Sequence, residues 1–294
     1  MSAYRYVLGA DIGGSHITAA VMDMENRVML EHSVSRSSLN SQAPVSHIMD
    51  SWTEVMNEAC QKAGVKLEKV GLAMPGPFDY ENGISLITGT GKYEALYQLN
   101  VKELLAKALG IGPEAILMKN DAACFLAGET FSGSAKNYNR VIGITLGTGL
   151  GSAIFDGNDV TDANLWCIPY GDSIAEDYIS TRWFLKRYHQ LTGLNILNVK
   201  EMTALYDESD TVRQIFDEFV QHLAAFLEHF QGQAKADAIV IGGNIARAAS
   251  RFLPGLNRAL KKLEISQPVF ISETTELAAL AGAASCWKTP QSIS

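Results

Sequence analysis

The sequence predicts an α/β protein made of two similar halves, and three observations support this fold class. A glycine-rich turn between two apolar runs occurs twice, at Val7–Asp23 and at Val141–Asp156, 134 residues apart. Segments with strand and helix patterns alternate after each copy, as they do in α/β folds. The chain has 294 residues, 47% of them hydrophobic, which is enough for two cores of ordinary size.

Each copy of the repeat has the pattern of a β-hairpin, because one apolar run enters the glycine-containing turn and another leaves it. Superposing the copies pairs Gly13 with Gly147 and Ala19 with Ala153. Glycine permits positive φ and lets backbone N–H groups approach an anion with no Cβ in the way. One such turn is common in structural loops. Two turns in register predict two half-domains, each presenting a phosphate-facing turn to one cleft, which suits a nucleotide.

The first half is expected to contain strands and helices in a mixed order. Successive strands are predicted at Tyr4–Ala10, His16–Met22 and Arg27–Val34. Apolar residues at helical spacing from Ile48 to Ala63 predict a helix that Gly64 ends. The remaining predicted elements are, in order, a strand at Val70–Met74, a helix at Val101–Leu109, a strand at Ala115–Lys119 and a helix at Ala122–Phe131.

The second half repeats this scheme. After the hairpin at 141–156, the predicted elements are helical regions around Ile174–Tyr188 and Val212–Gln231, a strand at Ala238–Ile241, a helix after Gly242-Gly243, a strand at Pro268–Ser272 and an Ala-rich helix at Thr274–Trp287. No low-complexity linker separates the halves. They are therefore expected to be joined by short connections.

Composition and charge argue against several classes of partner and location. The formal net charge is −8 and no Lys/Arg cluster stands out, so neither nucleic acid nor a membrane is an expected partner. No apolar run approaches the roughly 18–20 residues that span a bilayer, and no charged-then-apolar signal segment opens the chain. The four cysteines are scattered without a CxxC pair, which predicts reduced thiols in a cytoplasmic protein.

Five segments become specific in combination, because they occur in one order at characteristic spacings. They are Asp11-Ile12-Gly13-Gly14-Ser15, Pro75-Gly76-Pro77, Asn120-Asp121-Ala122, Thr145-Leu146-Gly147-Thr148-Gly149-Leu150-Gly151 and Ile241-Gly242-Gly243-Asn244. Together they resemble the ROK family of sugar kinases and sugar-responsive repressors, within the actin/hexokinase/heat-shock-protein ATPase superfamily. The resemblance covers nearly the whole chain. It implies two similar ribonuclease-H-like α/β domains with an ATP cleft between them.

The implied domains are a small N-terminal one at 1–118 and a larger C-terminal one at 119–274. The C-terminal helix, about 275–294, is implied to pack back on the first domain. The implied nucleotide-binding residues are Gly13, Gly14, Ser15, Thr145, Gly147, Thr148, Gly149, Gly242 and Gly243. Gly242-Gly243 also fits a tight strand–helix turn with no ligand, and the resemblance favours the nucleotide.

Asp11 stands at the tip of the first hairpin, where a carboxylate could hold Mg²⁺, through water, beside the nucleotide phosphates. Taken alone, Asp11 is better explained as an Asx-turn residue before two glycines. The paired hairpin and the resemblance favour the metal. The implied small molecules are therefore ATP and Mg²⁺.

Asn120-Asp121 is the predicted catalytic pair. The strand Ala115–Lys119 delivers it to the mouth of the sheet, where open α/β folds tend to bind ligands. The resemblance implies that Asp121 accepts the proton of an attacking sugar hydroxyl, while Asn120 fixes neighbouring hydroxyls. The residues alone favour a simple helix N-cap, since Asn and Asp are preferred there, and only the resemblance favours a catalytic role.

The predicted sugar pocket departs from the family. Typical members carry a His and three Cys that bind a structural zinc, whereas residues 164–180 hold one cysteine and no histidine. No zinc is therefore expected. Glu176 resembles a retained sugar-binding glutamate, although a first-turn glutamate is also favoured by the helix dipole. Asn164 replaces a sugar-binding glutamate, Gly76 completes the implied substrate contacts, and the loop Gly89–Tyr93 differs from the family's Asn and Gly-Trp.

These features predict an ATP-dependent, glucokinase-like enzyme that phosphorylates a hydroxyl of a hexose or hexosamine. The alternatives are a noncatalytic sugar-sensing member, or a superfamily phosphotransferase or ATPase acting on a non-sugar substrate. Repressor members carry an N-terminal helix-turn-helix module, and this sequence begins on the first phosphate-loop strand. His222 and His229 lie seven residues apart on one face of a predicted helix. That face is expected to be a surface or a dimer interface more readily than a metal site, so a homodimer is a possible assembly.

Overall fold

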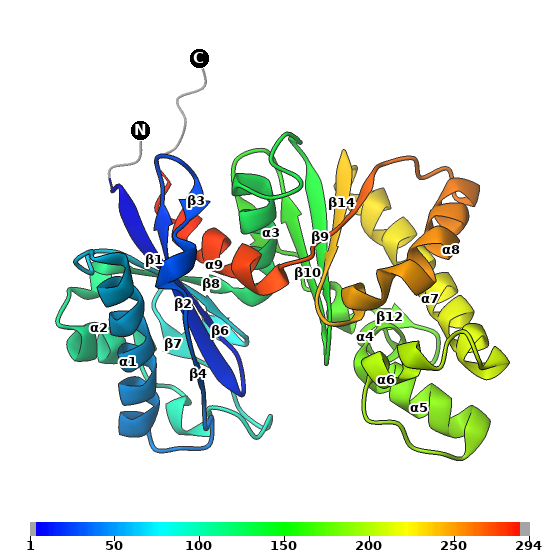
Figure 1. The fold of residues 1–294 in the computed structure, drawn as a ribbon, viewed down its shortest axis with the longest axis horizontal. Helices are drawn as coiled ribbons and strands as arrows, with labels where there is room; N and C mark the ends of the chain where they lie inside the picture. Colours follow the sequence, from blue (N-terminus) through cyan, green and yellow to red (C-terminus); the bar gives the residue numbers. More distant parts are fainter. Residues whose placement is uncertain (1–3, 289–294) are drawn as a thin grey trace. The chain divides into compact units, whose positions relative to one another are not determined.

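The computed structural model describes residues 4–288 and divides the chain into two compact units (Figure 1). The first unit comprises the residues up to Lys136 together with those from Glu276 onward, and the second is Asn137–Thr275. The division therefore lies at 136/137, whereas 118/119 was expected from the sequence. The reason is that β8 (Ile116–Asn120) pairs along its whole length with β5 (Val70–Met74), which keeps both strands in the first sheet.

The first unit is built on a six-stranded sheet in the order β3-β2-β1-β5-β8, with β4 paired to β2. Its other strands are β1 (Tyr6–Ile12), β2 (His16–Asp23), β3 (Val28–Met29) and β4 (Ser35–Ser38). Strands β1 and β2 form an antiparallel hairpin, and β1, β5 and β8 run parallel to one another. A separate small hairpin joins β6 (Phe78–Asp79) and β7 (Ile84–Ser85).

The second unit repeats this plan in a five-stranded sheet of order β11-β10-β9-β14-β15. Its strands are β9 (Val141–Leu146), β10 (Leu150–Phe155), β11 (Val160–Asp162), β14 (Ala238–Gly242) and β15 (Val269–Ile271). Strands β9 and β10 form an antiparallel hairpin, and β9, β14 and β15 are parallel. The sequence repeat is thus a repeat of sheet topology.

The two hairpins differ by one residue in their turns. Ile12 pairs with Ile17 across the first turn, whereas Leu146 pairs with Leu150 across the second. The sequence superposition therefore holds along the entering strands and shifts by one residue along the leaving strands. Because side chains alternate between the two faces of a strand, this one-residue shift puts the residues of β2 and β10 that the sequence superposition pairs on opposite faces of their sheets.

Four helices cover the two faces of the first sheet: α1 (Val45–Ala63), α2 (Val101–Leu109), α3 (Asp121–Phe131) and α9 (Thr275–Ser285). Leu8 of β1 belongs to the core beneath α1 and α2, whereas its neighbour Val7 packs with Ala281 of α9. Successive strand residues point to opposite faces. The helices α1 and α2 therefore cover one face, and α9 packs on the other.

Helix α9 approaches the first sheet closely because glycines remove the side chains between them. A Cβ added at Gly9 of β1 would lie 2.1 Å from the carbonyl oxygen of Leu280, and one added at Gly71 of β5 would lie 1.9 Å from that of Ala283. The sequence analysis expected a C-terminal helix of residues about 275–294 to pack on the first domain, and α9 does so over Thr275–Ser285. Of the expected helix, residues 289–294 lie outside the described residues.

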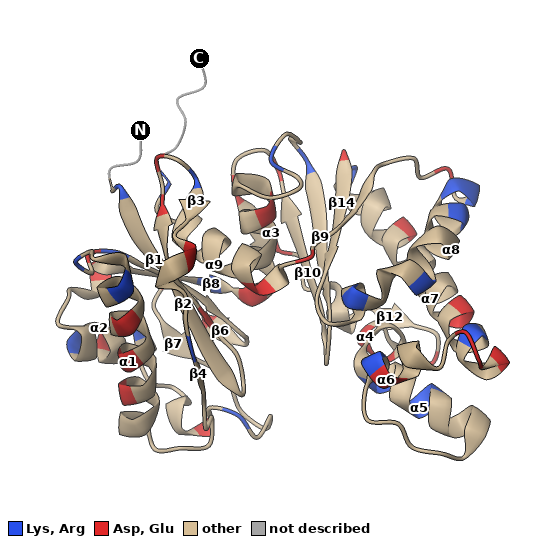
Figure 2. Ribbon diagram, viewed as in Figure 1, with Lys and Arg blue, Asp and Glu red and all other residues tan. Residues whose placement is uncertain are grey.

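The second unit holds its sheet against helices α4 (Glu176–Ile179), α5 (Thr181–Thr192), α6 (Val199–Ala204), α7 (Asp210–Ala234) and α8 (Ala249–Lys262). The core between them is rich in aromatic rings. Phe184, Phe216 and Phe219 are fully buried, and the Phe184 ring centroid lies 5.2 Å from that of Phe216 and 4.8 Å from that of Phe219. In Figure 2, positions coloured as Lys, Arg, Asp or Glu mark the ribbons of α1, α7 and α8, and other residues of these helices supply the cores.

Two predicted elements are broken in the structure. The strand predicted at Arg27–Val34 is replaced by β3, a single 3₁₀ turn and then β4, because the buried Ser33 hydroxyl accepts the N–H of Val21 and donates to the Leu30 carbonyl. The helical region predicted at Ile174–Tyr188 splits into α4 and α5. Its continuation fails at Thr181, whose N–H donates to the Gly147 carbonyl instead, at 2.8 Å.

The hairpin β12 (Pro169–Tyr170) and β13 (Ser173–Ile174), just before α4, was not predicted. Its strands are two residues long, which is too short for a periodic pattern. Within residues 4–288, no helix is both long enough and apolar enough to cross a membrane.

Candidate functional site

The first candidate site lies at the carboxyl edge of the first unit's sheet, where three parallel strands end. Asp11 of β1 is paired with Ala73 of β5, and Met74 of β5 is paired with Asn120 of β8. Asp121 follows directly as the first residue of α3. The sheet therefore brings Asp11 and the Asn120-Asp121 pair to one edge, where ligands of open α/β sheets bind.

Asn120 is the N-cap of α3, so the helix-cap interpretation of this residue is correct. Its side-chain oxygen accepts the N–H groups of Ala122 and Ala123, at 2.9 and 3.3 Å. Its amide nitrogen donates to the hydroxyl of Tyr80 at 3.3 Å, and that hydroxyl donates to the Met74 carbonyl. The cap uses the side-chain oxygen and leaves the amide nitrogen to bond Tyr80, whose hydroxyl lies at the start of the loop after β5, so capping and substrate contact are compatible.

Gly76 lies in that same loop. A Cβ added at Gly76 would stand 3.1 Å from the Tyr80 hydroxyl. Tyr80 thus links the loop after β5 to Asn120 at the end of β8. Sequence reasoning missed Tyr80, because nothing in its local pattern distinguishes it from a packing tyrosine.

Asp11 carries a strong electrostatic perturbation at this edge. The pKa of Asp11 is raised to about 7, first by burial and then by the negative charges of Asp121 and Glu276, against the opposing effect of Arg36. These carboxylates are therefore close enough to interact. Strongly perturbed carboxylates gathered in one place are typical of functional sites.

Glu276, at the start of α9, is held by the strands beside Asp11. It accepts hydrogen bonds from the Thr18 hydroxyl and from Arg36, the latter at 2.5 and 2.8 Å. His16 lies 3.7 Å from the same carboxylate. The sequence analysis did not single out Arg36 or Glu276, since 240 residues separate them and no local pattern joins them.

The first glycine turn is closed by a hydrogen bond from the Gly13 N–H to the His16 carbonyl, at 2.9 Å. The Tyr93 hydroxyl donates to the Gly13 carbonyl at 2.6 Å. Ser15 is exposed, and its hydroxyl lies 3.1 Å from the His16 ring nitrogen. Tyr93 therefore holds the predicted phosphate turn and does not itself open into a pocket, because its side chain is 1% exposed.

The second candidate site lies at the matching edge of the second unit's sheet. Thr145 of β9 is paired with Gly242 of β14, so the second turn and the diglycine end side by side. A Cβ at Gly243, whose φ is +92°, would lie 2.3 Å from the Leu146 carbonyl oxygen. The Gly243 N–H donates to the Thr275 hydroxyl. This edge brings together the predicted nucleotide residues of the second unit: Thr145, Gly147, Thr148, Gly149, Gly242 and Gly243.

Glu176 lies against this second turn. One of its carboxylate oxygens accepts the Leu150 N–H at 2.9 Å, and the same oxygen lies 2.6 Å from where a Cβ on Gly149 would be. Arg182, the second residue of α5, forms an ion pair with the other oxygen. The predicted sugar residue thus touches the predicted phosphate turn. Arg182 was missed, although it follows Glu176 by less than two helical turns.

Asn164 has an exposed side chain and a left-handed backbone with φ of +52°. Asparagine tolerates this conformation better than most residues do. Local backbone geometry is therefore sufficient to explain why asparagine occurs here. A sugar contact by its side chain stays a prediction.

No group of three or more His, Cys, Asp or Glu side chains in the described part of the chain is placed to hold a metal ion. That finding bears on sites built from protein ligands alone. Mg²⁺ is usually bound through one or two carboxylates together with substrate phosphates and water. The absence of zinc stays a prediction, which elemental analysis of the purified protein would test.

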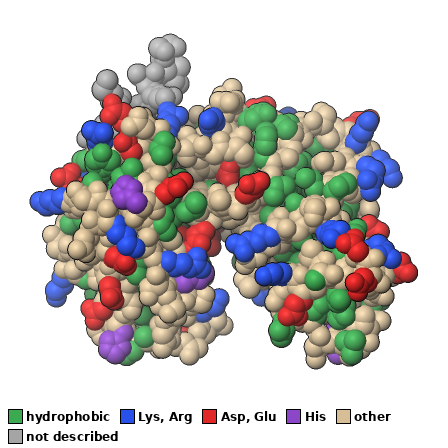
Figure 3. Space-filling model, viewed as in Figure 1, with side chains coloured by type: hydrophobic (Ala, Val, Ile, Leu, Met, Phe, Trp, Pro, Cys, Tyr) green, Lys and Arg blue, Asp and Glu red, His purple; other side chains and the backbone are tan. Residues whose placement is uncertain are grey.

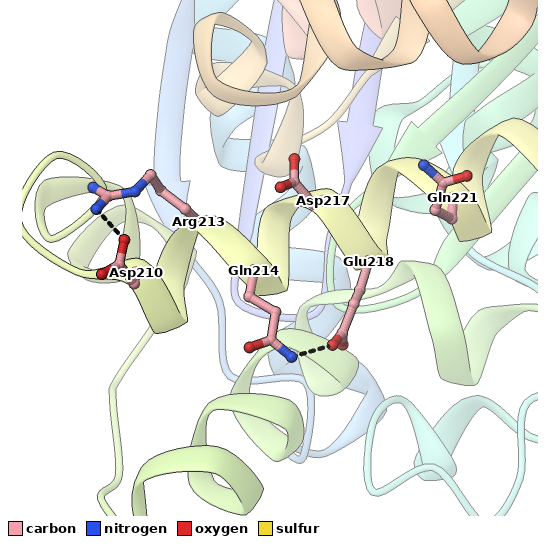
Figure 4. Close-up of a pocket in the computed structure, with 6 residues that line it drawn as sticks. All are labelled: Asp210, Arg213, Gln214, Asp217, Glu218 and Gln221. Atoms are coloured by element: carbon pink, nitrogen blue, oxygen red, sulfur yellow. Dashed lines mark hydrogen bonds and ion pairs between the residues drawn. The ribbon is translucent and has the colours of Figure 1, made fainter.

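A depression of about 510 Å³ lies along α7 (Figure 4). It is lined by the polar side chains Asp210, Arg213, Gln214, Asp217, Glu218 and Gln221. Several of these pair with one another, Arg213 with Asp210 at 2.5 Å and Gln214 with Glu218 at 2.8 Å. The depression is therefore a solvated helix surface.

Exposed apolar side chains also occur on the second unit, where Figure 3 shows hydrophobic groups at the surface over α5 and α6. The largest exposed ones in this region are Leu191, Leu194, Leu197 and Leu205. None of these four leucines is among the residues described above at the second unit's sheet edge.

Comparison with known proteins gives consistent matches. The ROK family model matches residues 7–163, more than half of the chain. An N-acetyl-D-glucosamine kinase of Shigella sonnei (strain Ss046) is 27% identical over 273 residues, which cover 81% of this chain and 84% of the relative.

Two solved structures share the fold. A ROK hexokinase from Thermus thermophilus superposes with a TM-score of 0.78 at 20% identity, covering 95% of this chain and 96% of the other. A ROK family glucokinase from Streptomyces griseus, in complex with glucose and AMPPNP, gives a TM-score of 0.77 at 22% identity, covering 96% and 98%. These matches confirm the predicted fold class and the family resemblance.

Proposed function

Because this chain belongs to the ROK family, we propose that it is an ATP-dependent sugar kinase that transfers the γ-phosphate to a hydroxyl of a hexose or hexosamine. The names of its relatives support this, since they include an N-acetyl-D-glucosamine kinase and a glucokinase. The observation that carries the proposal is the placement of Asp11 and Asp121 at one sheet edge, close enough for their charges to interact.

In this proposal Asp121 is the general base. Its position at the start of α3 leaves the residue exposed, so a sugar hydroxyl can reach it. Its carboxylate accepts the proton of the attacking hydroxyl as that oxygen bonds to phosphorus. Asn120, fixed by its capping bonds, offers its amide nitrogen to a neighbouring sugar hydroxyl.

Asp11 is proposed to be the carboxylate that holds Mg²⁺ through water. The residues fit this ion, because the carboxylates of Asp11, Asp121 and Glu276 gather negative charge that Arg36 only partly offsets. Bound there, Mg²⁺ would supply neutralisation of the charge on the transferred phosphate. Its presence would also favour the ionised form of Asp11.

The glycine turns hold the nucleotide in this proposal. Backbone N–H groups and hydroxyls at Thr145, Thr148 and the flanking glycines 147 and 149 face the phosphates, and Gly242-Gly243 lies against the adenosine. Gly13, Gly14 and Ser15 are the corresponding contacts of the first unit. Strand pairing supports the grouping of the second set, since Thr145 and Gly242 are register partners.

Sugar recognition is assigned to Asn120, Gly76, Glu176 and Asn164. Glu176 can serve both its protein partners and a sugar, because an ionised carboxylate offers about four acceptor positions. Its bond to the Leu150 N–H ties any sugar contact to the geometry of the second turn.

The test is a coupled ADP-release assay of the purified protein against a panel of hexoses, N-acylated hexosamines and ketoses. At least one hexose or hexosamine is expected to stimulate ADP release strongly above the sugar-free rate. ADP release that no sugar stimulates would support the superfamily ATPase alternative. Sugar binding without any ADP release would support the noncatalytic sensor.

A further inference from the structure

The loop between β7 and α2 packs against the first glycine turn and is hydrogen-bonded to it. The Tyr93 hydroxyl donates to the Gly13 carbonyl at 2.6 Å, and the ring packs edge-on against Trp52 at 5.7 Å. Both rings are fully buried. A buried donor bound to a turn carbonyl holds the loop in place, because losing that bond would leave polar groups unsatisfied.

Further bonds make this loop rigid. The Tyr93 N–H donates to the Ser41 carbonyl at 2.8 Å, and the Gln42 amide donates to the Gly91 carbonyl at 3.1 Å. Glu94 accepts the N–H groups of Thr90 and Gly91, at 3.0 and 3.1 Å. These bonds on both sides of residue 92 hold its backbone in place.

That residue is Lys92, and its side chain lies over Gly14. A Cβ built on Gly14 would stand 2.6 Å from Cδ, 2.8 Å from Cε and 2.9 Å from Nζ of Lys92. The whole end of the lysine side chain, ammonium included, thus occupies the space above the turn. Glycine at position 14 is what leaves room for it.

The ammonium of Lys92 forms no ion pair with any of the residues that the structure describes. The nearby cation Arg36 differs, since it is bound to Glu276. Lys92 is exposed, so its three N–H donors are available to a ligand. A positive charge above a turn of backbone N–H groups is a setting for an anion.

We propose that Lys92 is a phosphate-binding residue, which contacts the oligophosphate chain of the nucleotide at the turn Gly13–Ser15. This inference rests on the proposed kinase function and deepens it, because it adds a cationic contact to a turn otherwise made of backbone groups. Lysine serves as a point charge for phosphate, whereas arginine would grip it with two donors. The alternative is that Lys92 binds no ligand, and that its aliphatic chain covers Gly14 while its ammonium is solvated.

Three variants separate these cases. Lys92→Met keeps an unbranched stem over Gly14 and removes the charge, and Lys92→Arg keeps the charge. Lys107→Met is the matched control, because Lys107 is an exposed lysine in the last turn of α2. Binding of inorganic tripolyphosphate, ATP and AMP is measured by calorimetry at low and moderate salt, together with the melting temperature of each variant.

The proposal predicts that Lys92→Met binds tripolyphosphate and ATP about tenfold more weakly, which corresponds to about 1.4 kcal/mol, with AMP binding and melting temperature unchanged. Lys92→Arg should retain most of the affinity, and Lys107→Met all of it. The wild-type advantage should shrink as salt rises.

Equal affinity of Lys92→Met and wild type for tripolyphosphate would overturn the proposal, as would an equal loss of AMP binding. Failure of wild type to bind tripolyphosphate would overturn it as well. Its failure is distinguishable from failure of the kinase proposal: a protein that phosphorylates no sugar, yet loses tripolyphosphate affinity only in Lys92→Met, supports this inference alone.

Discussion

The two units share one sheet plan and differ in what stands at the carboxyl edge. The first unit ends its parallel strands in carboxylates, Asp11 and the adjoining Asp121. The second ends the equivalent strands in Thr145 and the diglycine Gly242-Gly243. A repeated fold therefore does not repeat its chemistry. In the proposed function, only the first edge supplies the general base, and the second edge adds Thr145 and the diglycine to the phosphate contacts that the glycine turns of both units make.

The units also fasten their glycine turns by different means. In the first unit, the Tyr93 hydroxyl binds the Gly13 carbonyl. In the second, the Glu176 carboxylate accepts the Leu150 N–H, and the Thr181 N–H donates to the Gly147 carbonyl. Each turn is thus positioned by a residue far from it in sequence.

The largest expected effect comes from removing the base that the comparison assigns to the first unit. Asp121→Asn should lower turnover roughly 10²–10⁴-fold, the usual loss when a general base is removed. Asp50→Asn, an exposed carboxylate on α1, is the matched control and should leave turnover unchanged. Steady-state ADP release measures both. Near-normal turnover of Asp121→Asn would reduce Asp121 to a helix-end residue.

The next largest expected effect is on stability, and it tests the close packing of α9 on the first unit's sheet. Gly71→Ala places a Cβ 1.9 Å from the Ala283 carbonyl oxygen, so the helix must shift. We expect a loss of about 1–3 kcal/mol in the free energy of unfolding, as for other overpacked cores. Urea denaturation measures it.

Gly232→Ala is the control for that change in the second unit. Gly232 lies in α7 with no atom within 4 Å of an added Cβ. Alanine there should leave stability unchanged or raise it by up to about 1 kcal/mol, because glycine is a poor helix former. Equal destabilisation by both substitutions would contradict the close packing of α9 on the first sheet.

Much of this comparison was predictable from the sequence. The repeated hairpin pointed to a repeated sheet, because two apolar runs around glycines are a local pattern. Partners distant in sequence were not predictable. Glu276 binds Arg36 across 240 residues, and Glu176 binds the Leu150 N–H across 26. The break at Thr181 has the same cause, since its N–H is captured by a turn that no helical pattern reports.

A smaller effect separates two roles of Glu176. If it reads the sugar, Glu176→Ala should raise the sugar KM roughly 5–150-fold, the range for losing a buried polar partner at about 1–3 kcal/mol, with little change in the ATP KM. Glu176→Gln keeps an acceptor for the Leu150 N–H and loses the ion pair with Arg182. It is expected to keep the ATP KM of wild type. An ATP KM that rises more than the sugar KM in Glu176→Ala would make Glu176 a support for the second turn only.

The smallest expected effect is a pH dependence of stability in the second unit. His222 packs against Tyr178 and Trp183 and hydrogen-bonds the Tyr170 hydroxyl at 3.1 Å. Burial lowers the pKa of His222 below 6.5, against the raising effect of Glu218, and Arg187 lowers it too. The unfolded chain therefore binds this proton more tightly, so His222 costs stability as pH falls through its unfolded value.

Urea denaturation at about pH 8 and about pH 5.5 tests this dependence. Wild type should lose more stability between the two than His222→Gln, which has no group to titrate. Parallel losses in the two proteins would show that His222 does not contribute.

The central claim, that Asp121 at the first edge serves proton transfer and not nucleotide binding whereas Thr145 at the second edge holds the nucleotide, is tested most directly by equilibrium binding of a non-hydrolysable ATP analogue. Asp121→Asn should bind it as wild type does, although its turnover is lost. Thr145→Val should bind it about fivefold more weakly, since one hydrogen bond of about 1 kcal/mol is removed. Analogue binding that fails in Asp121→Asn and survives in Thr145→Val would contradict this division.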